Sequence, residues 1–277
     1  MITEKAYAKI NLSLDITGKL PDGYHSLETV MQTVTLYDDV TVRKSGGISV
    51  SCGELSGENN LAFKAAKAFF AHTGIAGGAE INITKRIPVC GGFGGGSADA
   101  AAVLRALDTL YGTALGHDAL CAIALTLGAD VPFLIRGGTA LCTGKGELIT
   151  PVKCRAPLYY CLCAPHEGAS TAEMFARADG LGIYGRHGVS MADALRSGDV
   201  NAVAYLLHND FTDICASFCP STVFLRAALT GCGALASSLT GSGSGCFGVF
   251  ADLSCAENAA RVIGAECFAC AAAPALT

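Results

Sequence analysis

The sequence contains a glycine-rich segment that reads Pro88-Val89-Cys90-Gly91-Gly92-Phe93-Gly94-Gly95-Gly96-Ser97-Ala98-Asp99-Ala100-Ala101. Five glycines fall within six positions, and an Ala-rich stretch with helical character runs from about Ser97 to Tyr111. Glycine allows a close backbone approach to a ligand, and the first N–H groups of a helix are unpaired at the positive end of its dipole. The segment therefore predicts an anion site, with phosphate as the usual occupant. Ser97 lies where its hydroxyl can reach a phosphate or Mg²⁺.

This segment differs from two common nucleotide-binding motifs. No Lys-Ser or Lys-Thr pair follows it, as the Walker A motif requires. Gly243, Gly245 and Gly248 have the spacing of a dinucleotide fingerprint, but Val249-Phe250-Ala251 continues a strand there, whereas the fingerprint opens a helix. We therefore interpret residues 241–245 as a glycine turn between two strands and reject a dinucleotide oxidoreductase.

The segments around the glycine-rich stretch indicate a mixed fold. Ile10, Leu12, Leu14 and Ile16 alternate with polar residues, which is typical of a strand with one buried face. The first half also predicts strands at 28–36, 40–43, 48–52 and 79–84 and helices at 60–72, 97–111 and 117–127. The second half predicts helices at 191–196, 200–207, 222–229 and 256–263, a helix opened by a capping box at Ser170, and strands at 234–239, 246–250 and 267–271. We expect an α+β fold with two domains, 1–152 and 153–277.

Composition favours a small-molecule partner. The 277 residues are 51% hydrophobic and carry a net charge of −5, with no basic block for nucleic acid or an anionic membrane. No apolar run approaches the roughly 18 residues of a membrane span, and the N-terminus lacks the pattern of a signal peptide, so we expect a cytoplasmic protein. The single C-x-x-C among 14 cysteines, Cys267 to Cys270, lacks the second pair that a zinc site needs, so it predicts reduced core thiols, with a redox pair as the second alternative. The composition is compatible with a monomer and with a weak homodimer.

Two charged residues stand in apolar surroundings. Lys9 and Asn11 share one face of the predicted strand 10–16, and Asp130 precedes the apolar residues Val131-Pro132-Phe133, which we interpret as a strand. Burying Asp130 is costly unless a cation such as Lys9 pairs with it. Taken alone, Lys9 fits a solvated strand edge better, and Asp130 fits a helix-terminating turn equally well.

The ordered set of these segments resembles the GHMP kinases, named for galactokinase, homoserine kinase, mevalonate kinase and phosphomevalonate kinase. The phosphate loop of that family has the form P-x-x-x-G-L-G-G-G-S-S/A-D/N-A-A, with Phe93 here in place of the usual Leu. Thr240 to Gly245 is similar to the family's glycine turn beside the nucleotide. The resemblance implies an N-terminal domain similar to domain 2 of ribosomal protein S5 and a ferredoxin-like C-terminal domain.

A further resemblance concerns the acceptor. Pro21-Asp22-Gly23-Tyr24-His25 and Asn209-Asp210-Phe211 are similar to members that phosphorylate a cytidine diphosphate-linked methylerythritol. This implies ATP- and Mg²⁺-dependent phosphorylation of the acceptor's 2-hydroxyl in the non-mevalonate route to isoprenoid precursors. The alternatives are a homoserine or mevalonate type of kinase, which does not need Asp22 to His25, and a non-catalytic nucleotide or sugar sensor, which would not need Lys9 and Asp130.

The resemblance also implies roles for individual residues. Asp130 would accept the hydroxyl proton, and Lys9 would hold Asp130 ionised and orient the hydroxyl; a carboxylate held in this way is a weak base, so positioning can matter more than proton removal. The loop from Pro88 to Ala98 would wrap the triphosphate, with Ser97 as a contact for Mg²⁺ or the β-phosphate. The remaining expected contacts are Asn60, Lys85 and Arg86 near adenine or the phosphates, Asn11 at the polyol, and Tyr24 and His25 at the cytosine.

Overall fold

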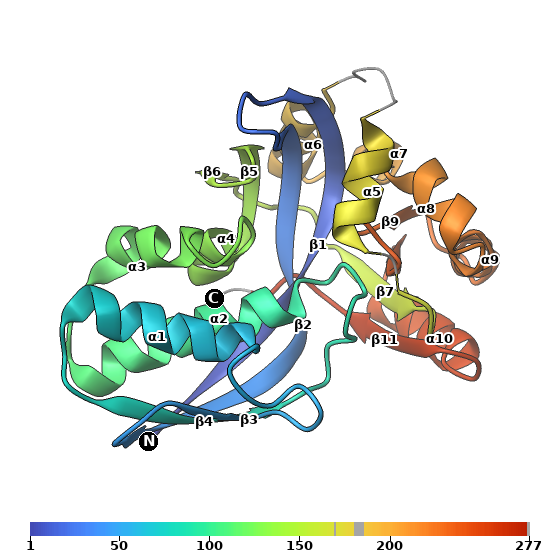
Figure 1. Cartoon of the computed structure of the whole chain (residues 1–277). Coiled ribbons are helices and arrows are strands. Elements are labelled where there is room, and N and C mark those ends of the chain that lie inside the picture. The colour runs from blue at the N-terminus through green and yellow to red at the C-terminus, as the bar shows by residue number, and fades with distance from the viewer. Residues whose placement is uncertain (169, 180–185, 276–277) are drawn as a thin grey trace.

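The computed structural model describes residues 1–168, 170–179 and 186–275. Two long antiparallel strands, β1 (Ile2–Lys19) and β2 (His25–Ser45), form the centre of a seven-stranded sheet (Figure 1). β4 (Gly78–Thr84) and β5 (Thr139–Gly144) pair with different parts of β2, while β3 (Ser49–Ser51) and β6 (Leu148–Pro151) extend the sheet outward. The short β8 (His208–Asn209) comes from the second half of the chain and pairs in parallel with β1.

Four helices belong to the first half of the chain: α1 (Leu61–Thr73), α2 (Gly95–Tyr111), α3 (Gly116–Leu125) and α4 (Val131–Arg136). α2 packs against β1 and β2, and its alanines, from Ala98 to Ala106, are buried. Asn60 caps α1 by accepting a hydrogen bond from the Ala62 N–H, and Gly74 ends that helix in the left-handed region.

The second sheet has the strand order β11-β7-β10-β9, and all its pairings are antiparallel. It consists of β7 (Tyr159–Ala164), β9 (Ala236–Leu239), β10 (Cys246–Phe250) and β11 (Phe268–Ala272). The order is fourth, first, third, second along the chain, with α9 (Ser221–Gly231) and α10 (Leu253–Ile263) packed against it. This arrangement confirms the ferredoxin-like expectation. The other helices are α5 (Thr171–Ala178), α6 (Gly188–Ser197), α7 (Val200–Tyr205) and α8 (Thr212–Phe218).

Three local predictions were wrong. β1 is buried on both faces from Ala8 to Asp15, because the turn at Gly241 and the start of α6 contact the face that the alternation predicts to be solvent-exposed. The apolar residues after Asp130 form the short helix α4 rather than a strand. Ser170 does precede α5, but its side chain makes no capping hydrogen bond. The division at residues 152 and 153 stays a prediction.

No single described helix combines the length and the apolar character that would let it cross a membrane. The helices α8 and α9 meet at a bend of 119°, and only the two together are long and apolar enough for a span, judged by length and composition alone.

Candidate active site

A cleft of about 760 Å³ brings together segments from both halves of the chain. Its wall contains β1, the glycine-rich loop, the start of α2, the residues before α4, and Gly241 and Ser242. The predicted site residues that line it are Lys9, Asn11, Asn60, Lys85, Pro88 to Ser97 and Asp130. Ala98 is buried behind the loop, and Tyr24 and His25 are not part of the lining themselves.

The glycine-rich loop ends in an open helix N-terminus. Gly94 precedes α2 with φ 72°, and no side chain caps the helix. A Cβ atom on Gly92, whose φ is +71°, would lie 2.2 Å from the carbonyl oxygen of Thr240. A Cβ on Gly96 would meet no atom within 4 Å. Gly92 is therefore required for the close approach of two backbones, whereas Gly96 faces open space where an anion could accept hydrogen bonds from the helix N–H groups.

Lys9 and Asp130 form an ion pair at the edge of this space. The distance between Lys9 Nζ and Asp130 Oδ2 is 3.4 Å, and their side chains are 4% and 36% exposed. The backbone N–H of Lys9 also donates to the Phe93 carbonyl at 2.9 Å, which fastens β1 to the glycine-rich loop. The pair thus places a buried cation and an accessible carboxylate beside the helix N-terminus.

Asn11 joins three parts of the site through its amide group. Its Oδ1 accepts hydrogen bonds from Lys9 Nζ at 2.8 Å and from the Gly241 N–H at 2.9 Å. Its Nδ2 donates to Thr29 Oγ1 at 2.8 Å. The amide therefore orients the Lys9 ammonium group and positions the second glycine turn.

Lys85 lies in a buried cluster with two carboxylates. It donates a hydrogen bond to Asp99 Oδ2 at 2.8 Å and another to Asp38, which is fully buried. Burial raises the pKa of Asp99 to about 7, against the opposing charge of Lys85. Burial alone would lower the pKa of Lys85, but the charges and hydrogen bonds of Asp99 and Asp38 outweigh it, so that pKa is raised. The positive charge of Lys85 is thus largely neutralised beside the loop, and Asp99 Oδ1 has no hydrogen-bond partner.

Tyr24 and His25 lie beside one end of the cleft. Lys145 and Phe175 line the cleft, and each contacts one of them. Lys145 Nζ is 4.0 Å from the centroid of the Tyr24 ring, and the Phe175 ring is stacked on His25 with centroids 5.0 Å apart. His25 Nε2 is also 2.9 Å from Asp179 Oδ1. The structure therefore adds an aromatic and a cationic side chain to this rim.

Sequence reasoning missed the lining residues Thr29, Lys145, Phe175 and Phe211. It also missed Asp38, the buried partner of Lys85. Phe175 and Phe211 are a T-shaped pair from α5 and the residue before α8, and no spacing in the sequence joins them. Asp38 lies between the predicted strands 28–36 and 40–43, and its partner Lys85 lies 47 positions further along the chain.

Comparisons with known proteins agree with this geometry. Residues 60–138 match the model of the GHMP kinases N-terminal domain and residues 191–269 the GHMP kinases C-terminal model. The chain is 41% identical to 4-diphosphocytidyl-2-C-methyl-D-erythritol kinase of Desulfitobacterium hafniense, and the match covers 93% of this chain and 90% of the relative. It is 40% identical to the kinase of the same name from Pelotomaculum thermopropionicum, and that match covers 94% of this chain and 93% of the relative.

Solved structures give the same result. A crystal structure of 4-(cytidine 5'-diphospho)-2C-methyl-D-erythritol kinase matches with a TM-score of 0.83 at 30% identity over 100% of both chains. A mevalonate kinase from L. major, with a TM-score of 0.79 at 18% identity over 100% of this chain and 97% of that one, shares the fold. The chain therefore belongs to the GHMP kinases and, within them, to the family of the 4-diphosphocytidyl-2-C-methyl-D-erythritol kinases.

Proposed function

We propose that the protein transfers the γ-phosphoryl group of ATP to the 2-hydroxyl of 4-diphosphocytidyl-2-C-methyl-D-erythritol, a step of the non-mevalonate route to isoprenoid precursors. The observation that carries this proposal is the Lys9–Asp130 pair beside the open N-terminus of α2, inside one cleft. The names of the relatives support this acceptor over homoserine or mevalonate.

The triphosphate would occupy the space in front of the glycine-rich loop. The free N–H groups at the start of α2 and its dipole favour phosphate oxygens there, and Gly96 leaves room for them. Lys9 supplies a positive charge beside the same space. Asn60 also lines the cleft, although its amide is already engaged with Ala62 and Leu55 at the start of α1.

The side chains near the loop fit a divalent cation of the magnesium class. Such ions prefer oxygen ligands, and both the Ser97 hydroxyl and the unpartnered Asp99 Oδ1 belong to residues that line the cleft. Mg²⁺ bound with ATP would neutralise charge on the phosphates. Ser97 would hold the ion or the β-phosphate, as the sequence predicts.

Asp130 is proposed to receive the proton of the acceptor hydroxyl. Its carboxylate is about one-third exposed, so an acceptor in the cleft can reach it, while Lys9 keeps it oriented. Phosphoryl transfer depends mainly on in-line positioning and charge stabilisation, and a carboxylate paired with lysine is well suited to positioning.

The cytosine ring is proposed to bind at the rim that contains Tyr24 and His25. Aromatic rings can stack on a base, and imidazole can form a hydrogen bond with its edge. Phe175 adds a further ring that lines the cleft. Asn11 remains a proposed polyol contact, although hydrogen bonds with Lys9, Gly241 and Thr29 already engage its amide.

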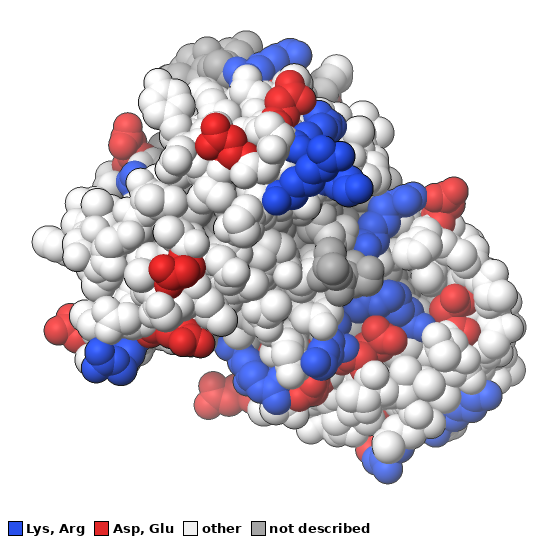
Figure 2. Space-filling model, turned by 180° about the vertical axis from the view of Figure 1, so that it is seen from behind, with Lys and Arg blue, Asp and Glu red and all other residues white. Residues whose placement is uncertain are grey.

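We further propose a cytoplasmic monomer or weak homodimer without nucleic-acid or membrane partners. The net charge of −5 supports this. Figure 2 shows basic and acidic side chains on one face with broad uncharged areas between them. The 14 cysteines are free thiols, as is usual in reducing compartments.

An ADP-release assay with ATP and Mg²⁺ tests the function, with 4-diphosphocytidyl-2-C-methyl-D-erythritol, homoserine and mevalonate as separate acceptors. We expect turnover with the cytidylyl acceptor alone. Turnover with homoserine or mevalonate instead would contradict the proposed acceptor. No turnover with any of the three, together with tight nucleotide binding, would favour the sensor.

A further inference from the structure

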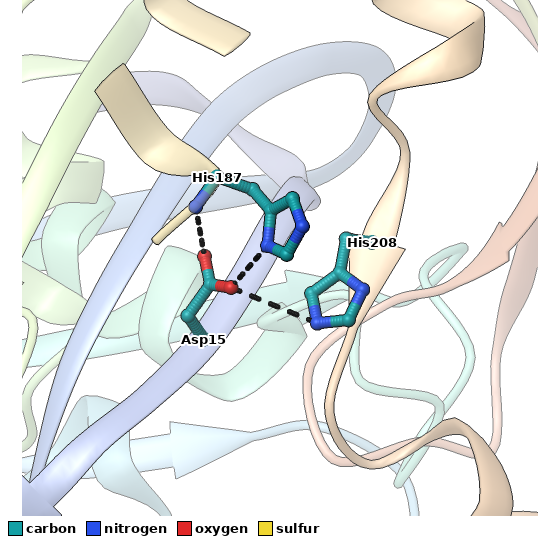
Figure 3. A group of neighbouring side chains, drawn as sticks. All are labelled: Asp15, His187 and His208. Atoms are coloured by element: carbon teal, nitrogen blue, oxygen red, sulfur yellow. Dashed lines mark hydrogen bonds and ion pairs between the residues drawn. The ribbon is translucent and has the colours of Figure 1, made fainter. Parts of the chain in front are cut away.

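A second group of functional side chains lies outside the cleft lining, where β1, β8 and the start of α6 meet (Figure 3). Asp15 is fully buried on β1, His187 precedes α6 and His208 begins β8. The Asp15 Oδ1 atom is 2.5 Å from His187 Nδ1 and 3.6 Å from His208 Nε2. The two imidazole rings are stacked, with centroids 4.1 Å apart, so two nitrogen atoms are directed at one carboxylate oxygen.

The surroundings of this group carry surplus negative charge. Asp210 Oδ1 is 2.7 Å from His208 Nε2, and Glu28 lies opposite Asp15 in the β1–β2 ladder. Both side chains are almost completely buried. In the described part of the chain, Asp15 and Asp210 form ion pairs with histidine alone, and Glu28 accepts a hydrogen bond from the Gly188 N–H. Buried carboxylates are stabilised by paired cations, by hydrogen bonds or by a metal ion, and a divalent cation would add positive charge to this group.

We propose that Asp15, His187 and His208 bind a divalent transition-metal ion of the zinc class. The three ligand atoms lie within 4.8 Å of one another. Two imidazole nitrogens and one carboxylate oxygen are a donor set that zinc accepts, whereas Mg²⁺ prefers oxygen alone. Asp210 Oδ1, next to His208 Nε2, is placed to supply a fourth ligand.

The required movement is small. Bond lengths of about 2.0–2.2 Å in a tetrahedral site separate neighbouring ligand atoms by about 3.3 Å. The contact between His187 Nδ1 and Asp15 Oδ1 must then lengthen by about 0.8 Å from its 2.5 Å. The His187 and His208 side chains are 36% and 32% exposed, so they can shift and an ion can enter. Asp15 is already oriented, because its Oδ2 accepts a hydrogen bond from the His187 backbone N–H at 3.1 Å.

The ion would connect three segments that support the acceptor side of the cleft. Leu14 and Phe211 line the cleft, and they are the direct sequence neighbours of Asp15 and Asp210. The β8 residue Asn209 donates hydrogen bonds to the carbonyls of Leu239 and Gly241. Metal binding would therefore stabilise the wall formed by β1, β8 and the second glycine turn, at a site distinct from the one proposed for Mg²⁺.

Metal titration of the chelator-treated full chain, without nucleotide, tests this proposal. Zn²⁺ binding is measured by calorimetry, and Co²⁺ binding by visible absorption, in the wild type and in His187→Ala, His208→Ala and His117→Ala. His117 is exposed at the start of α3 and outside the group, so its variant is the matched control. We expect one ion per chain, a loss of affinity of about 100-fold or more in the first two variants, and a change of less than about twofold in the control. Zn²⁺ should also raise the Tm of the wild type and the control.

Three results would overturn the proposal: no saturable binding by the wild type, unchanged affinity in both cluster variants, or a thiolate charge-transfer band showing that cysteines hold the Co²⁺. If a variant does not fold, NMR of the wild type decides instead. Zn²⁺ must then shift the ring signals of His187 and His208 and leave those of His117 in place, and unshifted signals of His187 and His208 would count against the site.

Discussion

Neutralising Asp130 separates its proposed role in catalysis from a role in stability. Asp130→Asn keeps the size of the side chain and a hydrogen-bond acceptor for Lys9, but removes the charge. At 3.4 Å and an effective dielectric constant of about 20, the attraction between Lys9 and Asp130 is about 5 kcal/mol before solvent is considered. Asp130 is 36% exposed, and Lys9 keeps its hydrogen bond to Asn11, so we expect a net stability loss of only about 1–2 kcal/mol.

The effect on the rate should be larger. Loss of a group that accepts a proton costs about 10²–10⁴-fold in kcat, which corresponds to about 3–5 kcal/mol. The Kd for ATP should change by less than about threefold, because the helix N-terminus and the glycine-rich loop remain intact.

Single-turnover kinetics, ATP titration and chemical unfolding of one preparation supply the three quantities. Asp118→Asn is the control, since it makes the same chemical change at a side chain that is 96% exposed on α3, and its kcat should stay within about twofold of the wild type. A kcat for Asp130→Asn near that of the control would refute the catalytic assignment. A rate loss matched by an equal loss of ATP affinity would assign Asp130 to ground-state binding instead.

Three other variants test separate parts of the site. His25→Ala should raise KM for the cytidylyl acceptor about tenfold with little change in KM for ATP, because it removes the imidazole stacked on Phe175. Steady-state kinetics measure both constants, and equal changes in the two KM values would contradict the cytosine role. Gly92→Ala should lower the free energy of unfolding by more than about 1 kcal/mol, since Gly92 has φ +71° and the new methyl group would lie 2.2 Å from Thr240 O. Gly96→Ala is the control, because its methyl group would meet no atom within 4 Å. Equal unfolding curves for the two variants would contradict the close approach of Gly92 to Thr240. Asp99→Asn should flatten the pH dependence of Tm. A carboxyl whose pKa rises from 3.8 to about 7 on folding stabilises the fold at low pH. That contribution is lost as pH rises from about 4 to about 7, by up to about 1.4 kcal/mol per pH unit. A wild-type Tm that rises with pH as steeply as that of the variant would contradict this reasoning.

Local patterns in the sequence predicted the elements that have strong local signals. α1 ends at Gly74, α2 follows the glycine-rich loop, and β9 and β10 flank a glycine turn; the structure confirms all three. β7 was not predicted, because Tyr159–Ala164 is a continuous apolar run without a period of two, and periodicity alone cannot assign such a run to a strand or a helix. α4 was predicted as a strand for the same reason, since six residues are too few to display a helical period.

The parts of the site that the sequence could not predict are those made by tertiary contacts. The family resemblance placed Lys9 and Asp130 in one site, and the structure supplies the distance between them. The resemblance did not predict that Asp38 pairs with Lys85, because a buried carboxylate and its partner cation need not share a sequence pattern. The group at Asp15 was missed for the same reason, since its three members come from positions 15, 187 and 208.

Backbone contacts explain why widely separated motifs occur together in this chain. The Lys9 N–H bonds to the Phe93 carbonyl at 2.9 Å, and the Gly245 N–H bonds to the Gly91 carbonyl at 3.0 Å. The glycine-rich loop is therefore held on one side by β1 and on the other by the turn before β10. Asn11 connects these two supports through its bond to Gly241. These bonds connect the proposed phosphate position to Lys9 and its partner Asp130, so we expect a shift of one segment to displace the other two. In the proposed reaction such a coupling would maintain the alignment of the acceptor hydroxyl with the γ-phosphate, on which the rate of phosphoryl transfer depends.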